Sequence, residues 1–219
     1  MLTLCWGAKR GAGTTLVAAG LTLASASPAL LVDLAGDAPL VLGVPEPTSP
    51  GVLDWLAASA PTERLAGLEV PLGQHRALMP RGGGTDAPAA GRWRALGEWL
   101  AADARHVCVD AGDTPPSELA AAAHARLLVV RNCYLHLRAA AHGAPRWPIT
   151  GAVLVSEPGR RLGVNDVERA VGAPVVAVVL LDPAIARAGD AGLLLGRLPG
   201  GLRAPLAPLA ASLPDLVHG

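Results

Sequence analysis

The sequence predicts an α/β fold, a doubly wound and mainly parallel sheet with helices on both faces. Apolar runs of strand length alternate with helical runs along most of the chain. Several strand-like runs are continuously apolar, which is typical of strands buried on both faces of a parallel sheet. A glycine-rich turn joins the first strand-like run to the first helical run, the order expected in such folds.

The individual elements follow from this alternation. Strands are predicted at residues 2–6, 29–33, 69–71, 77–79, 106–110, 125–130, 151–156 and 175–181. Helices are predicted at residues 14–26, 51–58, 92–104, 117–123, 135–141, 164–171 and 185–188. Two further segments, 81–88 and 143–148, are rich in glycine and proline and predict loops.

Size and composition favour a single globular domain. The chain has 219 residues, of which 51% are hydrophobic and 16% charged. Lys+Arg and Asp+Glu both number 18, so no net charge draws the chain to nucleic acid or anionic lipid. Basic residues are dispersed without interleaved aromatics, and we expect no sequence-specific nucleic-acid partner. Residues 1–200 are expected to form the domain, with residues 201–219 as a tail packed on it.

Cysteine and histidine give no sign of a metal site or a catalytic triad. Cys5, Cys108 and Cys133 are not at metal-ligand spacing, and their odd number favours a reduced, cytoplasmic protein. The six histidines are scattered, without zinc spacing or a Ser/His/Asp pattern.

The opening run and the tail each invite a membrane interpretation. Lys9 and Arg10 precede an uncharged stretch that resembles a signal peptide, but Pro28 breaks it and a strand already precedes it. We therefore expect no membrane span, while peripheral association through a partner stays open. The tail has a helix-like stripe of leucines, and three prolines in it argue against one unbroken helix. The tail either docks on the core or binds a partner.

Residues 6–15, Trp-Gly-Ala-Lys-Arg-Gly-Ala-Gly-Thr-Thr, are the most informative segment. A strand, a glycine-rich loop and a helix N-terminus together make a cradle for phosphate. The usual pattern is G-x-x-x-x-G-K-[ST], with the lysine on the outer phosphates and the hydroxyl on Mg²⁺. Here Ala8 replaces the first glycine and Thr14 the lysine, while Thr15 retains the hydroxyl. The alternative is a glycine-rich turn that binds no ligand.

Two carboxylates follow strand-like runs and are expected at the same edge of the sheet as the loop. Asp33 ends the run 29–33 and Asp110 ends the run 106–110. Such carboxylates hold Mg²⁺ through water or orient an attacking water. The alternative for each is that it accepts hydrogen bonds from the backbone of the following loop.

The loop resembles the deviant phosphate loop of the MinD/ParA family of ATPases, G-K-G-G-x-G-K-T-T. Lys9, the sole lysine of the chain, falls on the signature lysine, and Gly11 and Gly13 fall on two glycines. The resemblance implies a P-loop NTPase fold of the SIMIBI type. It implies that ATP or ADP contacts the loop residues Lys9, Arg10, Gly11, Ala12, Gly13, Thr14 and Thr15. It also implies Mg²⁺ at Thr15, and at Asp33 and Asp110 indirectly.

The sequence departs from the family pattern at the positions that are responsible for ATP hydrolysis in the family. Arg10 falls on a glycine and Thr14 on the catalytic lysine. In the family's D-x-D pattern Asp33 matches the first Asp, but Ala35 replaces the second, with Asp37 two residues further on as a substitute. The resemblance therefore implies an ATPase that is weak at most.

The last third resembles the CpaE/TadZ-like branch of the family, which belongs to pilus loci. The matching residues are 153–160, 166–176, 182–188 and 191–192. Many family members have an Asn after the strand that reads adenine, and Ser156 and Glu157 occupy that place here.

The function implied by this resemblance is positioning or assembly control of a partner machine. The partner is a Tad/Flp-type pilus or secretion system, or a septum site, and the protein acts as a homodimer in the cytoplasm, recruited to the pole or the inner face of the membrane. Two alternatives stay open. One is a slow ATPase switch in which Lys9 or Arg10 supplies the missing charge, and the other is a structural module with an empty nucleotide site.

Overall fold

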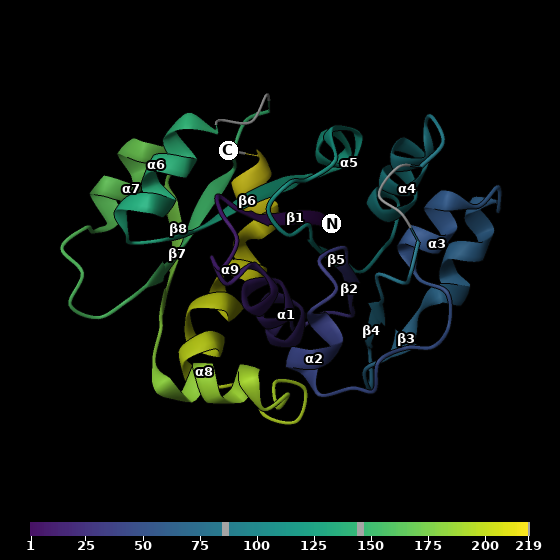
Figure 1. Cartoon of the computed structure of the whole chain (residues 1–219), viewed down its shortest axis with the longest axis horizontal. Helices are drawn as coiled ribbons and strands as arrows, with labels where there is room; N and C mark the ends of the chain where they lie inside the picture. Colours follow the sequence, from purple (N-terminus) through teal and green to yellow (C-terminus); the bar gives the residue numbers. More distant parts are fainter. Residues whose placement is uncertain (85–87, 144–146, 219) are drawn as a thin grey trace.

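The computed structural model describes residues 1–84, 88–143 and 147–218, and its centre is one eight-stranded sheet (Figure 1). The strand order is β3-β4-β2-β5-β1-β6-β7-β8. The strands are β1 (Leu2–Gly7), β2 (Ala29–Asp33), β3 (Val70–Pro71), β4 (Arg76–Met79), β5 (His106–Asp110), β6 (Ala125–Arg131), β7 (Gly151–Ser156) and β8 (Val175–Leu180). The helices are α1 (Thr14–Ala24), α2 (Ala38–Leu42), α3 (Val52–Ala57), α4 (Arg92–Ala101), α5 (Ser117–Ala122), α6 (Tyr134–His142), α7 (Val164–Val171), α8 (Pro183–Asp190) and α9 (Gly200–His218), with a 3-10 helix η1 (Thr62–Leu68).

Every strand pair is parallel except that of β3 with β4. The strand β1 lies in the middle, between β5 and β6, and all six of its residues are buried. A continuously apolar strand is stable only where both faces are covered, which is the position that β1 occupies. The predicted doubly wound, mainly parallel sheet is confirmed, with the short edge strand β3 as its antiparallel exception.

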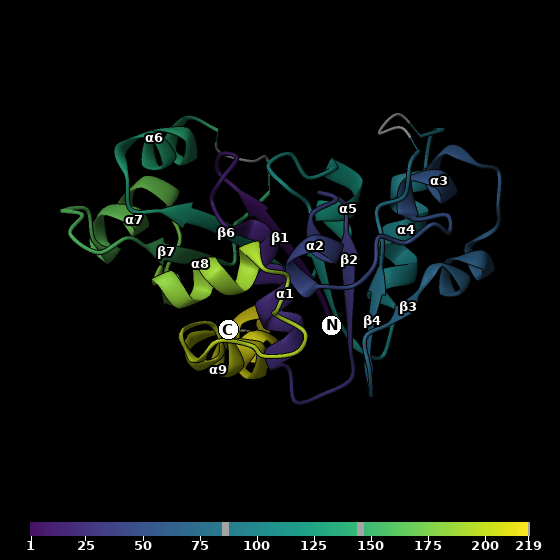
Figure 2. The ribbon, with the colours of Figure 1, turned by 60° about the horizontal axis from the view of Figure 1, so that its bottom comes forward.

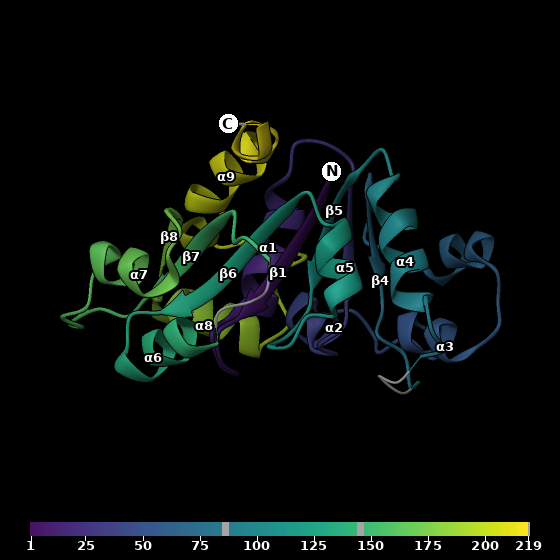
Figure 3. The same ribbon diagram turned by 90° about the horizontal axis from the view of Figure 1, so that it is seen from above.

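Helices cover the two faces of the sheet (Figure 3). The buried side chains form two separate cores. Alternate residues of β1 divide between them: Leu4 belongs to the core under α4, α5, α6 and α7, and Cys5 to the core under α1 and α9. With no Phe in the chain, leucine, valine and alanine fill most of both cores. Trp6 adds an edge-to-face contact with Trp147, with 6.5 Å between ring centroids.

The C-terminal helix α9 packs its leucines on α1 and β8. Leu206 lies against Gly20 of α1, where an added Cβ would come within 2.5 Å of its Cδ1. The expectation that the prolines interrupt this helix is wrong, because α9 runs unbroken through Pro205, Pro208 and Pro214. Pro208 and Pro214 are on the exposed side, where water can reach the carbonyl groups that they leave unpaired.

Several element boundaries differ from the prediction. The helices α2 and η1 were not predicted, and α8 extends over eight residues where residues 185–188 were expected. Short helices carry too few residues for a periodic pattern, and α2 depends on Pro39 at its start and on contacts with α1 and α8. Of the predicted loops 81–88 and 143–148, residues 85–87 and 144–146 lie outside the described residues.

The far end of α1 is closed by an arginine from a neighbouring strand. Arg76 of β4 donates from Nε to the carbonyl oxygen of Thr22, at 3.3 Å, and from Nη2 to that of Ser25, at 3.1 Å. The last carbonyl groups of a helix carry its negative end, and a cation there is stabilising.

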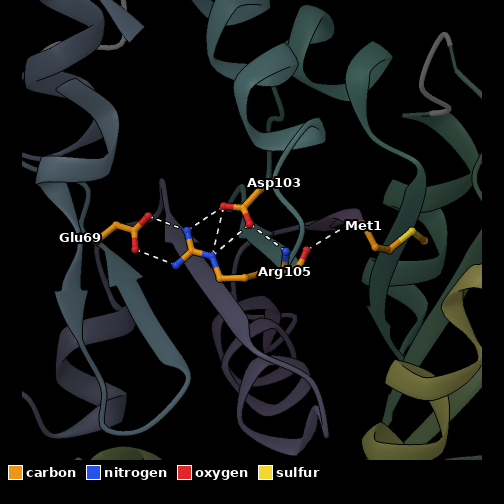
Figure 4. Close-up of polar contacts among 4 residues, drawn as sticks. All are labelled: Met1, Glu69, Asp103 and Arg105. Atoms are coloured by element: carbon orange, nitrogen blue, oxygen red, sulfur yellow. Dashed lines mark hydrogen bonds and ion pairs between the residues drawn. The ribbon is translucent and has the colours of Figure 1, made fainter. Parts of the chain in front are cut away.

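A second arginine network joins β3 to the start of β5 (Figure 4). Arg105 donates to both carboxylate oxygens of Glu69, at 2.8 and 2.6 Å, and also to Asp103. The amino group of Met1 donates to the carbonyl oxygen of Arg105 at 3.1 Å. These contacts hold the short β3 edge on the rest of the sheet.

Within the described ranges, no helix combines the length and the apolar character needed to cross a membrane.

Candidate functional site

The glycine-rich loop, residues 8–13, lies between the end of β1 and the start of α1 (Figure 2). Gly11 and Gly13 have φ values of 80° and 93°, which side chains other than glycine rarely adopt. Gly13 precedes the first turn of α1 and, as a glycine, has no side chain with which to cap that turn. The free N–H groups and the positive end of α1 are therefore turned toward the loop, as an anion site requires.

Thr14 occupies the first position of α1 and faces inward. Its side chain is buried, and its hydroxyl would lie 2.8 Å from a Cβ placed on Gly7. The missing side chain of Gly7 makes room for this hydroxyl. No cation therefore projects from the position that follows Gly13.

Thr15 and Asp110 lie together beneath the loop. The nearby Thr15 hydroxyl lowers the pKa of the Asp110 carboxyl, but burial is the larger effect and raises this pKa overall. Oδ1 of Asp110 accepts from the N–H of Gly112 at 3.2 Å, whereas Oδ2 is buried and has no hydrogen-bond partner among the residues that the structure describes. A threonine hydroxyl next to a buried carboxylate with one unused oxygen fits Mg²⁺ held partly through water.

The Asp33 carboxylate accepts hydrogen bonds from the backbone of the segment that follows β2. Oδ1 accepts from the N–H of Gly36 at 2.7 Å and Oδ2 from that of Ala38 at 3.1 Å. Burial, assisted by the charge of Asp110, raises the pKa of Asp33 to about 6, although these hydrogen bonds oppose the rise. Asp33 thus supports the start of α2, and a role toward Mg²⁺ through water stays a prediction.

The predicted convergence of these residues at one sheet edge is visible in the register. Asp33 of β2 pairs with Asp110 of β5, and Asp110 pairs with Cys5 of β1. The N–H of Gly7 then donates to the carbonyl oxygen of Gly112 at 2.7 Å. The loop, Asp33 and Asp110 are therefore adjacent at the carboxyl ends of three neighbouring strands.

An open cavity of about 1000 Å³ lies over this edge. Residues 9–16 line it on the side of the loop and α1, and apolar, polar and charged residues from other segments complete its wall. The charged side chains lining it are Lys9, Arg10, Arg81, Asp37, Asp113 and Glu118. Arg81, Asp113 and Glu118 were not predicted from the sequence, since they follow no motif and reach the site only through the fold.

Arg131, at the end of β6, is a further residue that sequence reasoning missed. Its Nη1 donates to the carbonyl oxygen of Gly11 at 3.3 Å, and its Nη2 forms an ion pair with Glu157. Glu157 is also held by Arg160 at 2.6 Å, and its backbone N–H donates to Asn132 at 2.8 Å. The segment that follows β7 is therefore tied to the phosphate loop, and both oxygens of the Glu157 carboxylate are occupied by arginines.

Similarity to solved structures identifies the class of fold. The septum site-determining protein MinD of Pyrococcus horikoshii OT3, complexed with Mg-ADP, has a TM-score of 0.73 at 19% identity, covering 99% of this chain and 97% of that chain. A chain of the MinC:MinD cell division protein complex of Aquifex aeolicus has a TM-score of 0.76 at 16% identity, covering 98% of this chain and 96% of that chain. A ParA family ATPase from Chlorobium tepidum TLS has a TM-score of 0.72 at 16% identity, covering 96% and 98%.

The chain therefore has the MinD/ParA fold of P-loop ATPases over nearly its whole length. No protein-family model matches the sequence, and no curated protein sequence matches it.

Chemically, the site offers binding groups for an anion. Backbone N–H groups and the end of α1 favour a phosphate, and Thr15 with Asp110 fits Mg²⁺. Three cations and three carboxylates line the cavity, so the side chains alone give no net attraction for a phosphate. Among the described residues no three His, Cys, Asp or Glu side chains gather to hold a metal ion, so Mg²⁺ here would depend on ligand phosphates and water.

Proposed function

We propose that the protein binds ATP or ADP with Mg²⁺ in the cavity over the phosphate loop, and hydrolyses ATP weakly or not at all. The observation that carries the proposal is the arrangement at the start of α1. Thr15 lies beside a buried carboxylate with an unused oxygen, while the preceding position holds an inward-facing, uncharged Thr14. In P-loop enzymes a lysine neutralises charge on the outer phosphates, and one such contact lowers the barrier by about 3–4 kcal/mol.

In this proposal the nucleotide acts as a structural ligand. The protein positions or regulates the assembly of a partner machine, a Tad/Flp-type pilus or secretion system or a septum site, through a homodimer. The MinC:MinD complex among the similar structures supports such a role, because there a protein of this fold is bound to a partner.

The proposal of a pilus partner is based on the resemblance of the last third of the sequence to CpaE/TadZ-like proteins. Deletion of the gene in its host should abolish pili and leave septum placement unchanged; a septum defect with normal pili would favour the other partner.

The proposal of a homodimer is based on Lys9. Its side chain is exposed in the single chain and lines the cavity mouth next to Arg10. We propose that it crosses to a second copy, where a bound phosphate or a carboxylate is its counter-charge. Light scattering of wild type and Lys9→Ala, with and without Mg-ATP, tests this. A monomer under every condition, or a dimer unaffected by the substitution, would contradict it.

Calorimetric titration with Mg-ATP and Mg-ADP, combined with a turnover assay, tests the nucleotide proposal. Binding without turnover is the expected result. Several turnovers per minute, abolished by Asp110→Ala, would show instead a slow ATPase switch in which Lys9 or Arg10 supplies the charge. No binding of either nucleotide would identify a structural module with an empty site.

A further inference from the structure

Arg10 connects the two loops that border the cavity. Its Nε lies 3.2 Å from Oδ2 of Asp113, and the Arg10 side chain is 90% exposed. Arg10 belongs to the phosphate loop, and Asp113 to the segment between β5 and α5, which also carries the backbone contact of Gly112 to Asp110. Both residues line the cavity, so the ion pair spans part of its mouth.

The pair is an exposed one, and exposed ion pairs are weak and easily exchanged. A guanidinium presents several N–H donors in a planar fork that matches a phosphate as well as a carboxylate. A doubly charged phosphate is the stronger partner of the two. Because Arg10 has no packing that fixes its guanidinium elsewhere, it can exchange one partner for the other.

We propose that Arg10 is the cation that contacts the outer phosphate of the ligand, and that Asp113 takes the place of that phosphate when the site is free. The inference rests on the proposed nucleotide function and deepens it. Binding then exchanges the partner of Arg10 and releases Asp113. The segment 111–116, which follows the Asp110 strand, is thereby coupled to ligand binding through a side-chain contact specific to this sequence.

Two variants separate this exchange from simple electrostatics. Asp113→Asn removes the competing carboxylate, and Arg10→Gln removes the cation. Glu118→Gln is the matched control, because Glu118 also lines the cavity but is not an ion-pair partner of Arg10 in the structure. Glu63→Gln and Arg64→Gln, both exposed on η1, control for net charge outside the cavity.

The experiment is calorimetric titration of each variant with Mg-ADP and with Mg-pyrophosphate. Asp113→Asn should bind both probes about threefold to tenfold more tightly than wild type, and Arg10→Gln about tenfold more weakly. Glu118→Gln should have a clearly smaller effect than Asp113→Asn. In the double variant Arg10→Gln/Asp113→Asn, the gain from Asp113→Asn should disappear, since there is no Arg10 left to release.

Three results would overturn the inference. The first is an Asp113→Asn affinity equal to that of Glu118→Gln, and the second is the same gain from Asp113→Asn whether or not Arg10 is present. Each of these two results leaves the nucleotide proposal intact if wild type binds Mg-ADP. The third is no binding of either probe by wild type or by Asp113→Asn, which would overturn both proposals. If wild type fails to bind and Asp113→Asn binds, the inference is supported.

Discussion

Asp33 and Asp110 are register partners on the adjacent parallel strands β2 and β5, and both carboxylates are fully buried at the carboxyl ends of these strands. Burial is the main reason that the pKa of each is raised, and the charge of Asp110 adds to the rise at Asp33. The pair therefore costs stability near neutral pH. A divalent cation close to Asp110 would reduce this cost, which is a physical reason for Mg²⁺ to favour this edge of the sheet.

The raised pKa of Asp33 predicts a specific pH dependence of stability. With a pKa of about 6 in the folded state against an ordinary aspartate value of 3.8, the folded state binds the proton more tightly, so the free energy of unfolding falls as pH rises from about 4 to about 6. The loss is about 3 kcal/mol at most. Asp33→Asn does not titrate, and urea unfolding in EDTA should show its stability relative to wild type rising across this range. Parallel pH profiles for the two proteins would refute the prediction.

His106 predicts the opposite slope. Burial, together with the N-terminal amine, lowers its pKa from 6.5 to about 4, so the folded state keeps the ring neutral while the unfolded state protonates it. The free energy of unfolding is therefore lost as pH falls from about 6.5 to about 4, by about 3 kcal/mol at most. His106→Gln should remove this acid loss. It keeps a polar group near the Thr3 hydroxyl, which lies 3.2 Å from Nε2 of His106. Unchanged acid sensitivity in thermal melts of the variant would count against this assignment.

Restoring a lysine at position 14 should strengthen nucleotide binding. Thr14→Lys places an ammonium at the start of α1, beside the phosphate site proposed above, and Mg-ADP affinity should rise about tenfold or more. Thr14→Met is the control for side-chain length without charge. Calorimetry is the measurement. Equal affinities for the lysine and methionine variants would show that the missing charge is not what limits binding.

The contact of Leu206 with Gly20 predicts a size-dependent coupling between α9 and α1. Leu206→Ala removes a fully buried side chain and should cost about 2–5 kcal/mol of unfolding free energy. Gly20→Ala crowds Cδ1 of Leu206, so its effect should be more favourable in the Leu206→Ala background, where the added methyl group has space. Chemical denaturation of the two single variants and the double variant measures this. Strict additivity would contradict the packing described here.

The sequence predicts the sheet well because burial on both faces leaves a local signature. The runs that became β1, β2 and β5 are continuously apolar over most of their length, and the last two end in Asp33 and Asp110. The loop is equally local, since its glycines and Thr15 lie within a few residues of one another. The main errors concern α2, which is short, and α9, where packing against α1 outweighs the prolines.

The contacts that join the loop to other segments have no local signature. Arg10 and Asp113 are separated by 103 positions, and Arg131 and Gly11 by 120. Their contacts exist only because β5 and β6 are the two neighbours of β1. A single arginine or aspartate in a loop carries no pattern that would identify its partner, so such pairs become visible only when the strand order is known.

The arginine that closes the far end of α1 also determines how the helix responds to a ligand. Since Arg76 fastens the carboxyl end of α1 to β4, a phosphate that pulls on the amino end acts on a helix that is anchored at its other end. The helix is thereby kept from sliding toward the ligand. Under the proposed nucleotide binding, displacement falls on the exposed contact between Arg10 and Asp113 and not on the anchored end of α1.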